Sequence, residues 1–377
     1  MALNLGSASA DLTLNVDNFL TNARQAEQAM DRLGSSGGGM FGKAEKSVES
    51  FGQKIERLGP QIQTVGIALV GLGVGITAAF GGAIKSSISF NSAMANVNSI
   101  AQLTTAEMEA LSDEVLNLAS ATGQGPQILA EGLYDIYSSG FQGAEGLQVL
   151  EVAANAANAG LTTTAVSARA VTAVLNAYGL GAEDAAHVSD VLFQTVNDGV
   201  ITFEQLANNM GNTLPLGNAL GISVEELAAA YAQMTLNGIG ASQAETQISS
   251  LMRAAINPTE ALTEAVNAYG YESAAALIEA EGMPGFLAQL GEASGGSSEK
   301  LFDLLGTSEA VNAALVLGKN DVADYTAELE RMNGASEGTG ATQKALAKQM
   351  ESTGFQLQRL KANFQVLLIT IGTFFEP

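Results

Sequence analysis

One histidine and two aspartates have the spacing of a general base with acidic partners. His187, the only histidine of the chain, lies three residues after Asp184 and three before Asp190, in a stretch that favours a helix. Residues three apart share one face of a helix, so these carboxylates could orient the imidazole ring. No nucleophile or basic partner with a recognisable spacing accompanies the ring, and we predict that His187 packs or makes hydrogen bonds rather than performing catalysis.

The other residues that could do chemistry also have structural explanations. The paired carboxylates Glu183-Asp184 and Glu225-Glu226 occur in predicted first turns of helices, where acidic side chains complement the helix dipole. Tyr134 and Tyr137 have helical spacing and are predicted to lie in a core or an interface. The chain has no cysteine and one histidine, which excludes disulfides, thiolate metal sites and multi-histidine metal sites within one chain.

The glycine-rich stretches do not indicate phosphate binding. Residues 34–39 and 71–75 have neither a strand-loop-helix context nor the GK[ST] ending of a Walker loop. The sequence therefore predicts no catalytic residues, no cofactor-binding residues, no metal ligands and no cofactors. We expect a protein that is not an enzyme.

The negative charge of the chain lies almost entirely in its middle. The formal charge is -23, and residues 86–340 hold thirty acidic and five basic side chains. Residues 1–85 hold seven of each. Because affinity for nucleic acids comes largely from Lys and Arg, an acidic surface repels phosphate backbones, and no direct nucleic-acid binding is predicted. The N-terminus lacks a basic segment followed by an apolar core, so we expect no secretory signal.

Five glycine-containing turns predict how the helices of this acidic region follow one another. A glycine just past a helix end adopts the left-handed conformation at no side-chain cost, the next apolar residue packs on the last turn, and a Ser or Thr caps the next helix. Short helices should therefore fold back on one another. The turns are Gly160-Leu161-Thr162, Gly179-Leu180-Gly181, Gly199 to Thr202, Gly221-Ile222-Ser223 and Gly238 to Ser242.

Capping signals place the starts of several helices. The boxes are Thr104-x-x-Glu107, Thr202-x-x-Gln205, Ser223-x-x-Glu226 and Ser242-x-x-Glu245. Asn257-Pro258-Thr259-Glu260 is interpreted as a cap, a first-turn proline and an acidic third position. Further glycines that should end helices are Gly123, Gly270, Gly282, Gly291, Gly306, Gly318 and Gly334. These signals predict about a dozen helices within residues 86–340, which we assign to one acidic helical core domain.

Two regions are expected before this domain. Residues 1–59 are predicted to form a short strand, at residues 11–16, and helices. Residues 60–85 are predicted to form an uncharged, glycine-rich hydrophobic helix, because Pro60 to Ile84 are twenty-five consecutive residues without a charge. The segment is long enough to span a bilayer as a transmembrane helix, and Gly71 and Gly75 form a GxxxG pair. Burial between copies of the chain or against a partner is the competing interpretation, and both stay open.

The chain ends in a region of different character. After a loose connector at residues 334–340, residues 341–377 are predicted to begin a long amphipathic helix, roughly from Thr342 to Ile371, that could bend at Gly354. Its apolar positions favour packing against another helix, so a homo-oligomer is expected. The sequence stops at an apolar, uncapped Phe374-Phe375-Glu376-Pro377, and we expect the protein to continue beyond it.

Several stretches, taken in order, carry a resemblance to a known family. They are Leu175 to Leu180, Ala185 to Leu192, Ala219 to Glu226, Gly238 to Ser242, Ile256 to Thr259, and Leu360 to Phe364 continuing to Gly372. From about Ser89 to Phe375, the chain resembles the N-terminal core region of the tail tape measure proteins of tailed bacteriophages. No single junction carries the resemblance, which depends on the ordered series.

The resemblance implies a structural tail protein of a tailed phage or related injection particle. Such a protein sets tail length during assembly and takes part in DNA ejection, with residues 60–84 as a segment that could enter the host membrane. The implied partners are further copies of the chain and proteins of the tail tube, tail tip or baseplate. The implied location is the virion, in the tail lumen, tail tip or baseplate, after assembly in the host cytoplasm.

Length limits how the chain could serve as a ruler. As one continuous helix, 377 residues would reach only about 565 Å. The glycine-broken region 86–340 should instead be a globular knob, with the ruler in sequence beyond Pro377 or in a short tail. The alternatives are a membrane-active, pore-forming helical protein and an enzyme such as a tail-borne cell-wall hydrolase. The second would need a further domain, because these residues offer no catalytic set.

Overall fold

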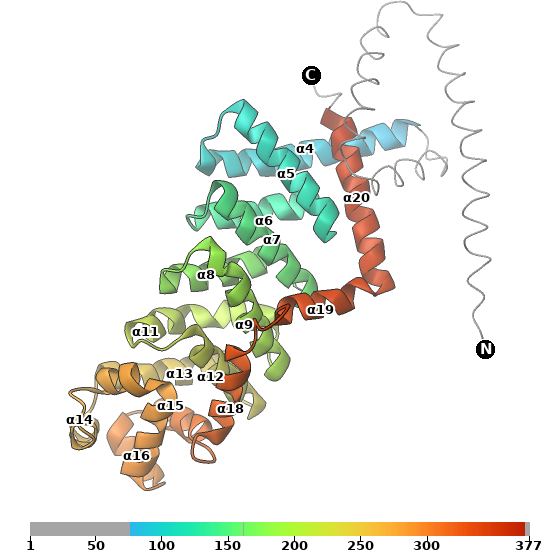
Figure 1. Cartoon of the computed structure of the whole chain (residues 1–377). Coiled ribbons are helices and arrows are strands. Elements are labelled where there is room, and N and C mark those ends of the chain that lie inside the picture. The colour runs from blue at the N-terminus through green and yellow to red at the C-terminus, as the bar shows by residue number, and fades with distance from the viewer. Residues whose placement is uncertain (1–75, 161, 374–377) are drawn as a thin grey trace, which may run out of the picture. The chain divides into compact units, whose positions relative to one another are not determined.

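The computed structural model describes residues 76–160 and 162–373 (Figure 1). Every regular element among these residues is a helix, which confirms the predicted all-α class. The short strand expected at residues 11–16, and most of the uncharged segment, lie outside the described residues. The chain divides into two compact units, one containing residues 1–130 and 353–377 and the other residues 131–352.

Three helices make up most of the described part of the first unit. They are α4 (Ile76–Ala101), α5 (Thr105–Thr122) and α20 (Thr353–Thr373), and α20 packs along α4 and against α5. Phe90, Val97, Val115 and Val366 from these helices are almost completely buried. The bounds of α4 show that it continues through residue 85, where the sequence analysis placed a boundary.

The second unit is a stack of short helices that follow one another in chain order. From α7 to α13, helices near one another in the sequence pack together: α7 on α8 and α9, α9 on α12, and α12 on α13 (Figure 1). The helix α17 then packs on α13 across the three helices between them. The stack is entered through α6 (Pro126–Ser138). Its further helices are α7 (Gly143–Gly160), α8 (Thr164–Tyr178), α9 (Ala185–Asp198), α10 (Phe203–Asn209), α11 (Thr213–Ala219), α12 (Val224–Leu236), α13 (Ala241–Ile256), α14 (Glu260–Ala268), α15 (Ala274–Ser294), α16 (Ser298–Leu305) and α17 (Ser308–Leu317).

Two later helices then run back along this stack. The helix α18 (Ala323–Asn333) packs on α12 and α9, and α19 (Ala341–Met350) packs on α9 and α7. The chain thus reverses its direction along the stack. Residues near 340 contact α9, which lies about 150 residues earlier in the sequence. This return brings together the side chains of the candidate site.

Three of the five glycine turns have the predicted left-handed glycine, and of these three only the turn at Gly221 also has the predicted serine cap. Gly179, Gly221 and Gly238 have φ angles of 65°, 71° and 84°, and the N–H of the apolar residue after each donates to a carbonyl in the last turn of the preceding helix. The other two differ. Gly160 is still helical at the end of α7, and Gly199 is extended at φ -89° because the chain there passes close to α12. A Cβ on Gly199 would lie 2.7 Å from the hydroxyl oxygen of Thr235.

Three predicted capping boxes are present, and two other helix starts were placed wrongly. The boxes of Thr104, Thr202 and Ser223 have both reciprocal hydrogen bonds. The helix α13 instead begins after Gly240, so Ser242 lies inside its first turn. In α14 the cap is Thr259, which leaves the preceding proline before the helix. Gly291 lies inside α15 and does not end it.

The C-terminal segment differs from the expected single helix. It forms two helices, α19 and α20, with a break at Glu351 and Ser352 rather than a bend at Gly354. Ser352, Thr353 and Gly354 favour such a break, because serine, threonine and glycine are poor in helix interiors. Among the described residues, no helix combines the length and apolar character needed to cross a bilayer.

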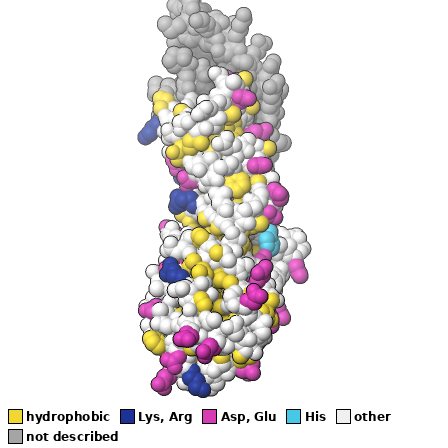
Figure 2. Space-filling model, turned by 90° about the vertical axis from the view of Figure 1, so that its left-hand side faces the viewer, with side chains coloured by type: hydrophobic (Ala, Val, Ile, Leu, Met, Phe, Trp, Pro, Cys, Tyr) yellow, Lys and Arg dark blue, Asp and Glu magenta, His cyan; other side chains and the backbone are white. Residues whose placement is uncertain are grey.

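Acidic residues far outnumber basic ones in the second unit. The second unit holds twenty-seven acidic and seven basic residues, a formal charge of -20. On the face drawn in Figure 2, carboxylates are distributed along the described residues and basic side chains are few. This distribution agrees with the uneven charge seen in the sequence.

Candidate functional site

His187 joins three separate parts of the second unit. Its Nε2 lies 2.6 Å from the Oε1 atom of Glu225 at the start of α12, and its Nδ1 lies 2.9 Å from the hydroxyl of Ser336. The aspartates that share its helix bond elsewhere: the carboxylate of Asp184 accepts from the N–H of Gly181 at 3.2 Å. The structure therefore gives His187 the hydrogen-bonding role predicted for it, with partners that the local spacing did not identify.

Asp190 caps a helix that lies 152 residues away in the sequence. Its Oδ1 accepts the N–H of Thr342, in the first turn of α19, at 2.8 Å, and the neighbouring Ser189 hydroxyl lies 3.1 Å from the Thr342 hydroxyl. Asp190 is only 7% exposed, so the buried carboxylate satisfies a backbone donor that α19 cannot satisfy internally. The carboxylate thereby fixes the start of α19 on α9.

The segment before α19, predicted as a loose connector, is tightly folded. Gly338 and Gly340 have φ angles of 70° and 77°, and the N–H of Ala341 donates to the carbonyl of Ala335 at 2.8 Å. A Cβ on Gly340 would collide with the Asp190 carboxylate. The prediction failed because glycine content alone does not distinguish a flexible linker from a turn that needs left-handed residues.

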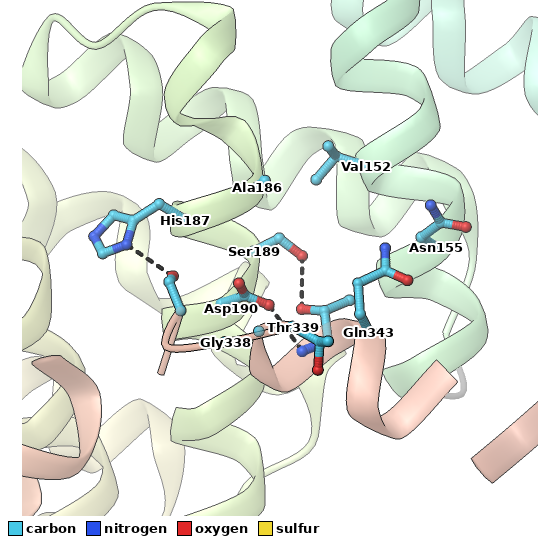
Figure 3. Close-up of a pocket in the computed structure, with 12 residues that line it drawn as sticks. Val152, Asn155, Ala186, His187, Ser189, Asp190, Gly338, Thr339 and Gln343 are labelled. Carbon is cyan, nitrogen blue, oxygen red and sulfur yellow. Dashed lines mark hydrogen bonds between the residues drawn. The ribbon is translucent and has the colours of Figure 1, made fainter. Parts of the chain in front are cut away.

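A pocket of about 240 Å³ lies where this segment meets α7 and α9 (Figure 3). Asp190 and Ser189 point toward the start of α19, and Asn155 and Gln343 approach from the two sides. The hydroxyl of Ser189, the Oδ1 atom of Asp190 and both ring nitrogens of His187 are engaged in the bonds described above. The pocket therefore results from the way the segment before α19 packs on α7 and α9. Hydrogen bonds between these elements account for the polar side chains that line it.

The start of α12 is a second point at which distant helices meet. The Oε2 atom of Glu226 accepts the N–H of Ser223 as a capping box requires, and its Oε1 accepts the N–H of Met283 at 2.8 Å. Met283 follows Gly282, where α15 bends with φ 71°. One carboxylate therefore caps α12 and also the second half of α15.

Two tyrosines bind carbonyls at the same helix start. The hydroxyl of Tyr325, on α18, donates to the carbonyl of Glu226 at 2.8 Å, and the hydroxyl of Tyr178 donates to the carbonyl of Ile222 at 3.1 Å. Burial raises the pKa of both phenols, and the nearby Glu226 carboxylate raises each pKa further. Both side chains therefore favour the neutral form and act as hydrogen-bond donors.

The remaining predicted residues are placed as follows. Tyr137 is buried and its hydroxyl accepts the N–H of Gly143 at 3.1 Å, whereas Tyr134 is partly exposed. Within the described residues, no group of three or more His, Asp or Glu side chains is arranged to hold a metal ion. The bond of Glu226 to Met283 and the bond of Asp190 to Thr342 were not predicted, because nothing in the local sequence distinguishes these carboxylates from others on helices. The local capping role of Glu226 was predicted correctly.

Comparisons with known proteins identify relatives of the chain. A family model described as phage-related minor tail protein matches residues 112–306. The chain is 26% identical to a tape measure protein of Pneumococcus phage Dp-1, over all of this chain and 32% of that protein. It is 28% identical to a probable tape measure protein of Clostridium phage phiCD119, over 87% of this chain and 36% of that protein. The chain thus spans about a third of the length of these curated relatives, and no solved structure matches it.

Proposed function

The chain belongs to the phage-related minor tail protein family. From this premise we propose that it is the helical core region of a tape measure protein. We propose further that this protein sets tail length and takes part in DNA ejection. The similarity to two proteins named as tape measure proteins supports a structural role in the phage tail. That the protein sets tail length and takes part in DNA ejection is what we propose beyond this structural role.

The single observation that shapes this proposal is the return of α18 and α19 along the stack. A ruler needs chain that extends in one direction, whereas here Asp190 bonds to Thr342 and the chain doubles back on itself. The longest described helix, α4, has 26 residues, which at 1.5 Å per residue is about 39 Å. We therefore assign to this region the role of a folded body, and we place length setting in other sequence of a longer protein.

We propose copies of the chain and proteins of the tail tube, tail tip or baseplate as partners. The charge of -20 on the second unit argues against binding DNA directly, because it would repel phosphates. The same negative charge would let DNA move past this folded region during ejection, because an acidic surface does not retain the genome. The proposed location is the tail lumen, tip or baseplate of the virion, after assembly in the host cytoplasm.

The test compares two sets of in-frame changes in the phage. Deletions and duplications in helical sequence outside residues 131–352 should change tail length by about 1.5 Å per residue in electron micrographs. Deletion of residues 131–352 should abolish tails instead of shortening them. Tails that shorten in proportion to a deletion within residues 131–352 would contradict the proposal, as would particles that lack the protein by mass spectrometry.

Membrane entry by residues 60–84 stays a prediction, because most of that segment lies outside the described residues. Liposome association of the isolated segment tests it, and a peptide that stays in the aqueous phase would contradict it. The pore-forming alternative predicts that the purified monomer permeabilises liposomes. No described helix could span a bilayer, and we keep the tail protein as the proposed function.

A further inference from the structure

A groove with an apolar floor and a polar rim opens between α15, α16 and α17. It encloses about 460 Å³, within the range of pockets that bind small ligands or single anchoring side chains. Its floor consists of side chains that are at least nine-tenths buried, and Leu315, at the edge, is 43% exposed. The floor residues are Leu287, Leu290, Leu301, Ala314 and Val322.

Gly291 in the wall of this groove has no visible role within the chain. It lies in the last turn of α15, its φ is not positive, and a Cβ built on it would meet no atom within 4 Å. Glycine is unfavourable in a helix and is used where another backbone or a ligand approaches closely. Gly295 differs, because its φ of 55° makes it a left-handed cap. The open space over Gly291 therefore admits an approaching partner.

The polar rim of the groove is negative. The carboxylates that line it belong to Glu292 and Asp321, and no basic side chain is among the lining residues. The C-terminal end of α15 adds the negative end of a helix dipole. Two bases adjoin lining residues in the sequence, Lys300 before Leu301 and Lys319 after Gly318. The ammonium of Lys319 donates to the side-chain oxygen of Asn237, which caps α12, at 3.4 Å. Charge complementarity thus selects a cationic occupant.

We propose that this groove docks a segment of a partner protein in which apolar side chains are flanked by Lys or Arg. The apolar side chains fill the space above Leu287 and Leu301, and the basic groups reach Glu292 and Asp321 at the rim. Long basic side chains suit this arrangement, because their stems cover apolar surface while their heads stay at the rim. The inference adds a partner surface to the proposed tail protein, and it does not depend on length setting.

Binding is measured with the whole purified chain and three labelled peptides, by fluorescence anisotropy. The probe is a short capped helical peptide of leucine and alanine with lysines beside the leucines. One comparison peptide has glutamates in place of lysines, and the other has serines in place of leucines. The lysine and leucine peptide should bind at least about tenfold more tightly than either comparison peptide, which corresponds to 1.4 kcal/mol.

Variants of the chain separate docking in the groove from general attraction to an acidic protein. Gly291→Leu should fill the groove and weaken binding about tenfold, whereas Gly211→Leu, at an exposed glycine with equally open surroundings, should leave it unchanged. Asp321→Asn should weaken binding about threefold, because asparagine keeps the left-handed conformation at φ 53° and removes the charge. Circular dichroism of each variant checks that its helical content matches that of the unaltered chain.

Two outcomes would overturn the proposal. Equal binding of the lysine and leucine peptide to the chain and to the Gly291→Leu variant would show that the groove is not the binding site. Equal loss of binding in the Gly211→Leu and Gly291→Leu variants would assign the attraction to the chain as a whole. If Gly291→Leu does not fold, Gly291→Ala with Asp321→Asn provides the same comparison, since a Cβ at residue 291 meets no atom.

Discussion

The carboxylate of Glu226 accepts the backbone N–H of Met283 at 2.8 Å, across 57 residues of sequence. The same carboxylate accepts the N–H of Ser223, so one buried side chain satisfies the first turns of two helices. At Gly282 the chain between the two halves of α15 adopts φ 71° and ψ -178°, which frees the N–H of Met283 from the helix ladder. The bend in α15 and the cap of α12 are therefore one structural feature.

We predict that Glu226→Ala destabilises the second unit by about 2–4 kcal/mol, because it leaves two backbone donors without their acceptor in a buried place. Gln205→Ala is the matched control. Gln205 completes the capping box of α10 in the same unit, but it is exposed and makes no tertiary bond there. Its loss should cost about 1 kcal/mol or less in chemical denaturation. Equal losses for the two variants would show that the bond to Met283 contributes nothing.

A second prediction concerns the start of α19. Asp190→Ala should remove the cap from Thr342 and increase hydrogen exchange of the α19 amides well above that of α7 and α9. Asp190→Asn keeps an acceptor and should have a smaller effect. Gly340→Ala should act like Asp190→Ala, because a Cβ there collides with the Asp190 carboxylate and φ 77° strains any other residue, at a cost of about 1–3 kcal/mol.

Gly338→Ala is the control for the second prediction. Gly338 is also left-handed, but a Cβ on it meets no atom within 4 Å, so its substitution introduces backbone strain alone. Exchange of α19 should therefore rise less in Gly338→Ala than in Gly340→Ala. The reverse order would mean that contact with Asp190 does not hold α19 in place.

Local signals explain which parts of this fold the sequence predicts. The boxes of Thr104, Thr202 and Ser223 were correct because both partners lie within one turn, where side chain and backbone meet without tertiary help. Ser242 had the same pattern, but the cap of α13 is Gly240, two positions earlier. A capping pattern therefore identifies a helix start to within a residue or two and does not fix its first residue.

The tertiary bonds could not be predicted, because nothing local distinguishes the side chains that make them. The sequence around Asp190 on α9 resembles that of any polar helix residue. Its partner, Thr342, is 152 residues away in the sequence. His187 was predicted to make hydrogen bonds, yet its partner Glu225 was assigned only to the first turn of α12. The bond of Asp190 depends on the return of α19 to α9, and the bond of His187 to Glu225 depends on the packing of α9 on α12. Helix periodicity does not contain that information.

His187 gives a third prediction. His187→Ala should lower stability by only about 0–1 kcal/mol, because the ring is half exposed and such pairs contribute little in water. The loss should be local, with faster hydrogen exchange around Ser336, and His187→Gln should restore part of the protection by keeping a donor. A loss as large as that of Glu226→Ala would contradict this assignment of His187 to a surface junction.

The buried phenols predict a loss of stability in alkali. Burial raises the pKa values of Tyr178, Tyr231 and Tyr325 above the ordinary value of 10.0. The unfolded chain releases these protons near pH 10, whereas the folded protein retains them to higher pH. The stability of the neutral folded state is therefore fully present below about pH 10 and declines as pH rises toward the folded pKa values, by up to about 1.4 kcal/mol per pH unit for each phenol.

Tyr325→Phe tests this prediction, because it removes the most deeply buried phenol. At neutral pH the variant should lose about 1 kcal/mol with the hydrogen bond to the Glu226 carbonyl. Above pH 10 its melting temperature should fall less steeply than that of the unaltered chain, because one titrating group is gone. If Tyr325→Phe and the unaltered chain lose stability at the same rate in alkali, then Tyr325 ionises as readily when folded as when unfolded, and its buried bond to Glu226 does not hold the phenol neutral.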